Sequence, residues 1–158
     1  MIEKDERKMT TSAGLAVYRN NGDVEVLLGH MGGPYWAKKD EGAWSFPKGE
    51  RLPGEPADVA ARREFAEELG FAAPLGPLRP LGLVRASAKE IEIFGLQGEV
   101  DLAAFAPGSF STEWPPRSGR LVSFPEIDRA AWFALDDARR KLSKAQRPFV
   151  DRLAQLIK

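Results

Sequence analysis

The chain has 158 residues, of which 43% are hydrophobic and 29% are charged, and its 23 basic residues balance 23 acidic ones. This length predicts a single domain, 1–158, and the balanced charge disfavours general adhesion to nucleic acid or to an anionic membrane surface. The absence of cysteine excludes disulfides, a thiolate nucleophile and a cysteine zinc site, and one histidine cannot form a histidine metal cage.

The N-terminal part of the sequence predicts an arm followed by a hairpin. Residues 1–10 are charged and lack the apolar core of a signal peptide, and no apolar run in the chain reaches the length of a membrane span. We therefore expect a flexible arm at 1–10 and a cytoplasmic protein. Residues 11–18 predict a mostly buried strand, and residues 24–28 a second strand that pairs with it across a turn at 20–23.

A glycine-bearing loop follows at 30–42. It places two aromatic residues beside two lysines, a combination that can hold a base and phosphates, and Tyr35 and Lys39 are the candidates for substrate contact. The alternative is a surface loop whose aromatic side chains cover an edge of the core. His30, the only histidine, is interpreted as a structural residue rather than a catalytic one.

The next stretch changes from strand to turn to helix. Residues 43–47 predict a short strand that leads directly to Lys48, which either contacts a phosphate oxygen or faces solvent. Glycine and proline break regular structure over 49–56. A helix rich in alanine, glutamate and arginine is predicted at 57–69, with Gly70 as its C-terminal cap.

Three glutamates share one face of the predicted helix. Glu64, Glu67 and Glu68 stand at i, i+3 and i+4, within an arc of about 100°. Such close like charges repel one another unless a cation lies on them, and oxygen ligands suit Mg²⁺ or Mn²⁺. An adjoining apolar stripe that includes Phe65 and Leu69 should pack on a sheet and leave the carboxylates in a cleft. Small residues one turn earlier are expected to leave room for a bulky anion: Ala57, Ala60 and Ala61.

The stretch from 49 to 71 resembles the signature of the Nudix family, G-x5-E-x7-R-E-U-x-E-E-x-G-U, in which U is apolar. Every position matches: Gly49, Glu55, Arg63, Glu64, Phe65, Glu67, Glu68, Gly70 and Phe71. With seven fixed residue types at roughly 1 in 15 each, a chance match at a given start is on the order of 1 in 10⁸. The competing interpretation, a solvated acidic helix face, does not account for this register.

The resemblance implies both a fold and a reaction. The fold is α/β (α+β), a Nudix fold with a mixed central β-sheet between helices and the signature as a loop–helix–loop at 49–71. The reaction is the hydrolysis of a nucleoside diphosphate that is linked to another group. The cofactor is Mg²⁺ or Mn²⁺, bound as two or more ions.

The resemblance also implies roles for the signature residues. The metal ligands are the carboxylates of Glu64, Glu67 and Glu68 and the carbonyl of Gly49. Arg63 belongs to the catalytic group by holding a glutamate in position through a charge-assisted contact. Two further residues serve the structure of the motif: Glu55 and Gly70.

After the signature, residues 81–87 and 90–100 predict a hairpin closed by a tight turn. Arg85 and Lys89 are further candidates to face an anion, although strand parity leaves this undecided. A long loop is predicted at 101–119, and long loops are often functional.

Within that loop, a Trp-Pro-Pro segment begins at Trp114 and is followed by Arg117. The segment either stacks on a nucleobase while Arg117 touches phosphate, or is anchored by one buried tryptophan. Strands are then predicted at 120–124 and 130–134. Two helices complete the chain, with Pro148 breaking or offsetting the first turn of the second: 135–142 and 144–157.

The general base has several candidates. Glu64 is one, since it lies within the signature. Glu126 is preferred because it lies six residues before Trp132, which resembles a Glu-x5-Trp arrangement in dinucleoside tetraphosphate hydrolases of the family. The alternative interpretation of Glu126 is a charged turn residue after a proline. Two other glutamates stay open as candidates: Glu99 and Glu113.

These features favour a Mg²⁺-dependent pyrophosphohydrolase whose substrate is a dinucleoside polyphosphate such as Ap4A, or a (d)NTP. Nucleotide sugars, diphosphoinositol phosphates and 5′-capped RNA remain open. The alternative from another functional class is a non-catalytic regulatory module that only binds nucleotides. Such modules generally lose signature carboxylates, whereas this chain keeps all of them. We expect the partner to be a small-molecule nucleoside polyphosphate. Binding to a membrane is not expected and binding to nucleic acid is disfavoured, and the protein is expected to be a monomer or a homodimer.

Overall fold

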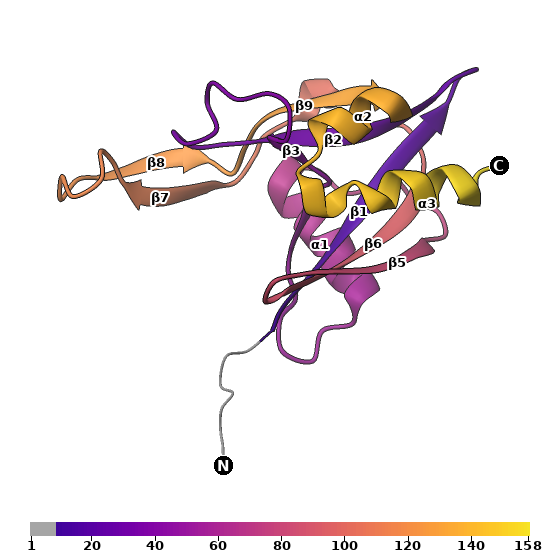
Figure 1. The fold of residues 1–158 in the computed structure, drawn as a ribbon, viewed down its shortest axis with the longest axis horizontal. Coiled ribbons are helices and arrows are strands. Elements are labelled where there is room, and N and C mark those ends of the chain that lie inside the picture. The colour runs from indigo at the N-terminus through magenta and orange to yellow at the C-terminus, as the bar shows by residue number, and fades with distance from the viewer. Residues whose placement is uncertain (1–8) are drawn as a thin grey trace, which may run out of the picture.

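A mixed β-sheet with helices on both faces forms the centre of the computed structural model, which describes residues 9–158 (Figure 1). The strand order is β3-β2-β1-β6-β5, with β4 pairing to β1 and β9 pairing to β2. This arrangement confirms the predicted fold class. The strands of this sheet are β1 (Thr10–Asn20), β2 (Val24–Met31), β3 (Trp44–Ser45), β4 (Lys48–Glu50), β5 (Arg79–Ala86), β6 (Lys89–Gln97) and β9 (Ile127–Ala134).

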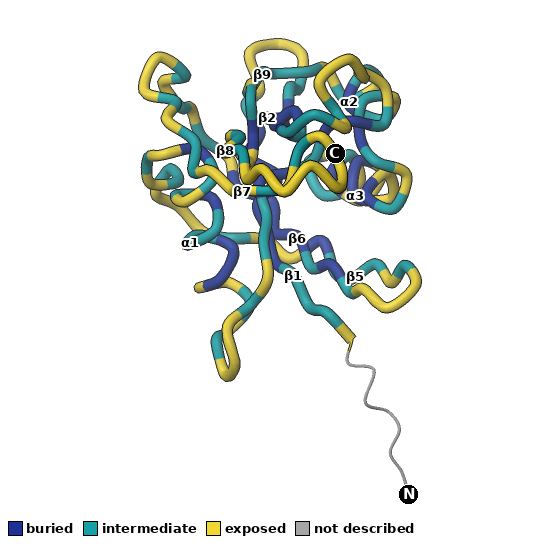
Figure 2. The backbone as a smooth tube through the Cα atoms, turned by 90° about the vertical axis from the view of Figure 1, so that its left-hand side faces the viewer, coloured by how far each residue is buried: buried dark blue, intermediate teal, exposed yellow. Residues whose placement is uncertain are grey.

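The predicted flexible arm at 1–10 lies mostly outside the described residues, and Thr10 already belongs to β1. β1 forms the predicted hairpin with β2 and runs parallel to β6 along its other edge, which makes the sheet mixed. Its middle is apolar and buried, because side chains of alternating residues enter the cores on the two faces of the sheet. Figure 2 shows these buried strands at the centre of the molecule.

Helix α1 (Ala57–Leu69) has the bounds that the sequence predicts. Gly70 caps it with φ 86°, and its N–H donates to the carbonyl of Ala66. The helix packs on the sheet through fully buried side chains that include Ala60 and Ala61. The expectation that these alanines leave room for an anion is therefore wrong. Their small size instead lets the helix axis approach the sheet closely.

Helices α2 (Leu135–Lys141) and α3 (Pro148–Leu156) cover the opposite face. The second C-terminal helix starts at Pro148 and not at residue 144, because residues 144–146 form a separate 3₁₀ turn. A proline at the first helical position is favourable, since its missing N–H would be unpaired there anyway. Within residues 9–158, no helix combines the length and apolar character needed to cross a membrane.

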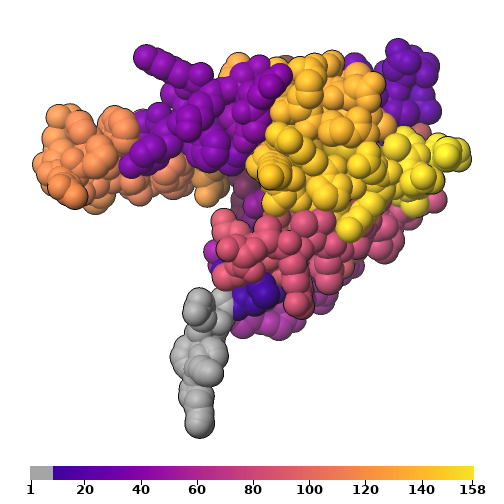
Figure 3. All heavy atoms as spheres, in the orientation of Figure 1, coloured from indigo at the N-terminus to yellow at the C-terminus, as the bar shows by residue number. Residues whose placement is uncertain are grey.

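The segment predicted as a loop at 101–119 contains a strand. β7 (Ser109–Glu113) pairs with β8 (Leu121–Pro125) in a separate two-stranded sheet that projects from the body of the molecule (Figures 1 and 3). The strand predicted at 130–134 also starts earlier, at Ile127. These strands were missed or shortened because most of their side chains are exposed or half-buried, which gives little hydrophobic alternation.

His30, near the end of β2, is fully buried beside β9 and the loop that follows β2. Its Nδ1 lies 2.8 Å from a carboxylate oxygen of Asp128, and its Nε2 lies 2.6 Å from the carbonyl oxygen of Lys39. Both ring nitrogens thus bind groups that hold the loop to the sheet, which supports the structural interpretation of His30.

Candidate active site

One cleft collects the signature residues that are predicted as metal ligands. It has a volume of about 410 Å³ and lies between α1, the start of β1, β4, the start of β6 and the junction of β8 with β9. The cleft thus contains all three helix glutamates, the predicted carbonyl ligand, the preceding lysine and the preferred general base. Its lining residues are Thr10, Ser12, Lys48, Gly49, Glu50, Glu64, Glu67, Glu68, Lys89, Ile91 and Glu126.

Gly49 lies in β4, a strand that the sequence interpretation treated as a turn. β4 pairs with β1, so that Gly49 stands opposite Ala13. A methyl group on Gly49 would lie 2.0 Å from a carboxylate oxygen of Glu64. A side chain at position 49 would therefore displace the Glu64 carboxylate from its place beside the backbone.

Glu68 is the most deeply placed of the three helix glutamates. Burial raises the pKa of Glu68 to about 8 from its usual 4.5, although the backbone N–H of Lys48 donates to its carboxylate at 3.2 Å. Burial also raises the pKa of Glu64 and lowers the pKa of the Lys48 side chain. The cleft therefore disfavours ionisation of two of its carboxylates unless a cation joins them.

Arg63 ties the loop before α1 to the helix. Its guanidinium donates to both carboxylate oxygens of Glu55, at 2.8 and 2.9 Å, and to the carbonyl of Glu50 at 3.0 Å. Nη1 of the same guanidinium contacts Glu64 at 2.8 Å and Glu67 at 3.1 Å. Arg63 thus contacts the carboxylates of three glutamates, where the sequence interpretation expected a contact with one.

The Glu55 contacts give a testable pH dependence. The Arg63 guanidinium, helped by the N–H of Leu52, lowers the pKa of Glu55 to about 2 from 4.5. Since the folded pKa is the lower one, this stabilisation is present above pH 4.5 and is lost as the pH falls from 4.5 towards 2. We expect Glu55→Gln to lower the melting temperature at pH 7, and the difference from wild type to shrink below pH 4.5.

The matched control is Glu41→Gln, because Glu41 pairs with Arg140 at the exposed surface. Exposed ion pairs contribute little, so this variant should melt close to wild type over the whole pH range. A difference between Glu55→Gln and wild type that persists unchanged at pH 2.5 would contradict the assignment.

The cleft fits a hard divalent cation in its chemistry. Its donors are carboxylate and carbonyl oxygens, the ligands that Mg²⁺ and Mn²⁺ prefer. Among residues 9–158, however, no three histidine, cysteine, aspartate or glutamate side chains are arranged to hold a metal ion as they stand. Glu64 and Glu67 contact Arg63 instead. Each of these contacts uses only one oxygen, Oε2, of its carboxylate.

Glu126 lies in the same cleft as the helix glutamates, at the junction between β8 and β9. The other two candidates outside the signature lie elsewhere. Glu99 pairs with Arg19, and Glu113 accepts hydrogen bonds from backbone N–H groups of its own hairpin. Of the candidates for the base, only Glu64 and Glu126 line the cleft.

Of the five residues predicted to bind substrate, Lys48 alone lines the cleft. Tyr35 and Trp114 contact each other edge to face, with ring centroids 5.2 Å apart, and so join the loop after β2 to the β7–β8 hairpin. Arg117 lies exposed in the same hairpin. Lys39 lines a separate pocket of about 530 Å³, beside Trp44 and Phe133. For these four residues, substrate contact stays a prediction.

The cleft also contains residues that the sequence interpretation missed or left undecided. Lys89 faces the cleft, whereas Arg85 is exposed and pairs with Glu90. Thr10 and Ser12 join the site because β1 runs parallel to β6, with Thr10 opposite Lys89. This pairing joins residues far apart in the sequence, and no local pattern predicts it.

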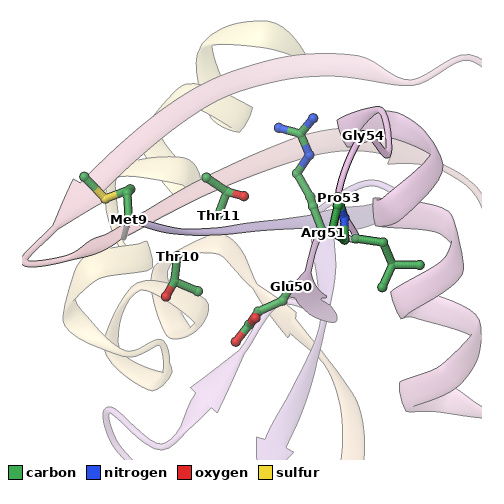
Figure 4. Close-up of a pocket in the computed structure, with 8 residues that line it drawn as sticks. Met9, Thr10, Thr11, Glu50, Arg51, Pro53 and Gly54 are labelled. Atoms are coloured by element: carbon green, nitrogen blue, oxygen red, sulfur yellow. The ribbon is translucent and has the colours of Figure 1, made fainter. Parts of the chain in front are cut away.

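A second pocket, of about 580 Å³, adjoins the cleft at the N-terminal end of β1 (Figure 4). Thr10 and Glu50 line both, so the two spaces are neighbours along one surface. The remaining lining residues of the second pocket are Met9, Thr11, Arg51, Leu52, Pro53 and Gly54.

A family model, the NUDIX domain, matches residues 8–153. The chain belongs to the Nudix family. The resemblance drawn from the signature is thereby confirmed, and so, at the level of the family, is the prediction of a hydrolase acting on acid anhydrides. Nudix hydrolases generally use divalent metal ions, which agrees with the oxygen donors of the cleft.

Solved structures of Nudix proteins share the fold over most of their length. An Ap4A hydrolase from C. elegans, in a binary complex, is 21% identical with a TM-score of 0.63, over 94% of this chain and 97% of the other. A MutT protein from Methanosarcina mazei Go1 is 18% identical with a TM-score of 0.58, over 97% and 98%. The NUDIX domain of Shewanella oneidensis NrtR, complexed with ADP ribose, is 11% identical with a TM-score of 0.63, over 95% and 89%.

Proposed function

We propose that this Nudix protein is a Mg²⁺-dependent hydrolase, built as one domain, that cleaves a pyrophosphate linkage in a nucleoside polyphosphate by attack of water at phosphorus. The substrate is a dinucleoside polyphosphate such as Ap4A, or a (d)NTP. The observation that carries the proposal is the single cleft in which Glu64, Glu67 and Glu68 lie with Lys48 and Glu126. The fold shared with an Ap4A hydrolase supports the substrate class.

The residues that would hold Mg²⁺ (or Mn²⁺), as two or more ions, are the three helix glutamates and the carbonyl of Gly49. When bound, the ions neutralise phosphate oxygens and lower the pKa of water. A cation there also offsets the cost of ionising Glu64 and Glu68 in the cleft. Arg63 then keeps Glu55 and the loop before α1 in place.

The other residues of the cleft bind the substrate and move a proton. Lys48 and Lys89 contribute positive charge to the cleft, where they contact phosphate oxygens. Glu126 accepts a proton from water as the water oxygen bonds to phosphorus. The P–O bond of the bridging oxygen breaks, and its electron pair leaves with the departing phosphate group.

The test is a substrate panel of Ap4A, (d)NTPs and nucleotide sugars with Mg²⁺, with products identified by mass spectrometry in ¹⁸O-labelled water. The labelled product shows which phosphorus atom is attacked, and EDTA in place of Mg²⁺ is the control. We expect turnover of Ap4A or a (d)NTP and none with EDTA. Nucleotide binding without turnover of any compound would contradict the proposal and favour a binding module.

A further inference from the structure

Glu126 is the single residue between β8 and β9, and both of its backbone groups bond to glycines. Its N–H donates to the carbonyl of Gly108 at 2.9 Å, and its carbonyl accepts from the N–H of Gly32 at 2.9 Å. The N–H of Gly108 donates in turn to the carbonyl of Glu67 at 3.3 Å. Two backbone hydrogen bonds thus connect Glu126 to the helix that carries the proposed metal ligands.

Gly32 has no space for a Cβ atom, and a Cβ atom on Gly108 would be tightly placed. A Cβ atom on Gly32 would lie 1.8 Å from the carbonyl oxygen of Pro125, and one on Gly108 would lie 3.3 Å from the Glu126 carboxylate. Neither glycine has a positive φ angle, so backbone conformation does not explain their presence. The presence of these glycines is explained by the close approach of the backbone segment around Glu126.

A register shift brings Gly32 to this place. β2 pairs with β9 in regular register up to His30 opposite Arg129, and then Met31 pairs with Ile127. Asp128 is the extra residue of the resulting bulge. Bulges re-aim side chains, and this one places the residue after Met31 next to the residue before Ile127.

The backbone position of Glu126 sets the range that its carboxylate can reach, because no other side chain in the described part of the chain holds it. The side chain is exposed at the edge of the cleft, and no side chain within residues 9–158 forms an ion pair or hydrogen bond with its carboxylate. A general base must come within about 3 Å of the proton that it accepts, and a misplacement of about 1 Å costs on the order of 100-fold in rate.

We propose that Gly32 and Gly108 are positioning residues that hold the backbone of Glu126 against the acidic cleft, so that its carboxylate reaches the attacking water. The inference rests on the proposed function, in which Glu126 is the general base. It adds that the position of this base is set by two glycines outside the signature, one from the loop after β2 and one from the segment before β7.

The test is a double-mutant cycle on the best substrate of the panel. Glu126→Gln should lower kcat by about 10²- to 10³-fold. Gly32→Ala must displace backbone and should lower kcat by about 10- to 100-fold with KM nearly unchanged. Gly32→Ala added to Glu126→Gln should cause no further loss, because the base is already absent. Gly108→Ala, which needs a smaller adjustment, should show the same behaviour with a smaller effect.

Two measurements separate positioning from general destabilisation. Hydrogen exchange should show weaker protection of the Glu126 N–H in Gly32→Ala, while the melting temperature stays well above that of the assay. The control is Gly95→Ala, whose added Cβ would meet the Leu153 and Leu156 side chains at an ordinary 3.5 Å, and which should keep wild-type turnover.

If Glu126→Gln lowers kcat and the double variant shows the product of the two single losses in kcat, the positioning role is overturned. The proposed function is unaffected by that result. A wild-type kcat in both glycine variants, with both folded, would also overturn the positioning role and leave the proposed function unaffected. Wild-type turnover in Glu126→Gln would remove Glu126 as the base and overturn this inference, while the metal-dependent hydrolysis would still be measured by the panel. If Gly32→Ala does not fold, Gly108→Ala provides the same cycle.

Discussion

Glu68→Gln is expected to lower kcat/KM by about 10³-fold or more while the protein stays folded, since removal of a single electrostatic contact to a transition state already costs about 10²- to 10³-fold. The substitution removes one negative charge at nearly constant volume from the deepest carboxylate of the cleft. Glu67→Gln should act in the same direction. Initial rates at several Mg²⁺ concentrations, together with calorimetric Mg²⁺ titration, would show whether weaker metal binding accompanies the loss.

The matched controls are Glu99→Gln and Glu113→Gln, because these glutamates lie outside the cleft and are held by partners of their own. Both should retain wild-type turnover and Mg²⁺ affinity. Circular dichroism would verify that all four variants are folded. Wild-type turnover in both Glu67→Gln and Glu68→Gln would mean that this face of α1 is not the metal site.

The part of the site that the sequence predicts is the part that depends on local spacing. The bounds of α1 follow from its composition and from Gly70, which adopts the left-handed conformation expected of a helix cap. The face that carries the three glutamates follows from the period of 3.6 residues per turn. The signature adds Gly49, although the packing of the Glu64 carboxylate against this residue is visible only in the folded chain.

The parts that the sequence does not predict depend on pairing between distant segments. Lys89 and Thr10 enter the cleft through the parallel pairing of β1 with β6. The β7–β8 hairpin replaces most of a predicted loop, because a strand whose side chains are mostly exposed has no hydrophobic period to detect. Gly32 and Gly108 carry no local signal, since the close approach of other segments to these two glycines exists only in the folded chain.

The residues predicted to bind substrate also depend on contacts that the sequence does not indicate. The sequence makes Tyr35 and Trp114 candidates to contact a nucleobase, and in the structure the two rings contact each other. Residue type indicates an aromatic surface at each position but does not indicate which group lies against it. Whether a nucleobase competes for either ring is a question for the substrate panel with Tyr35→Ala and Trp114→Ala.

The metal-free protein is expected to lose stability as the pH rises, through the ionisation of Glu68, one of the proposed metal ligands. The pKa of Glu68 is about 8 in the folded chain and 4.5 in the unfolded one. Between these values the folded state holds a proton that the unfolded state has released, so the free energy of unfolding falls as the pH rises from 4.5 to 8. The loss is roughly 2–4 kcal/mol, after allowance for a carboxylate that is only partly shielded from solvent.

Thermal melting in EDTA from pH 5 to pH 8.5 measures this loss, and Glu68→Gln is the informative comparison. Glutamine cannot ionise, so the variant should show a flatter profile and should melt above wild type at pH 8. Mg²⁺ at pH 8 should raise the melting temperature of wild type and have little effect on the variant. If melting temperature changes with pH in the same way for the two proteins in EDTA, Glu68 ionises without a cost in stability. The ionisation of Glu68 would then give no reason to expect a cation on this face of the helix.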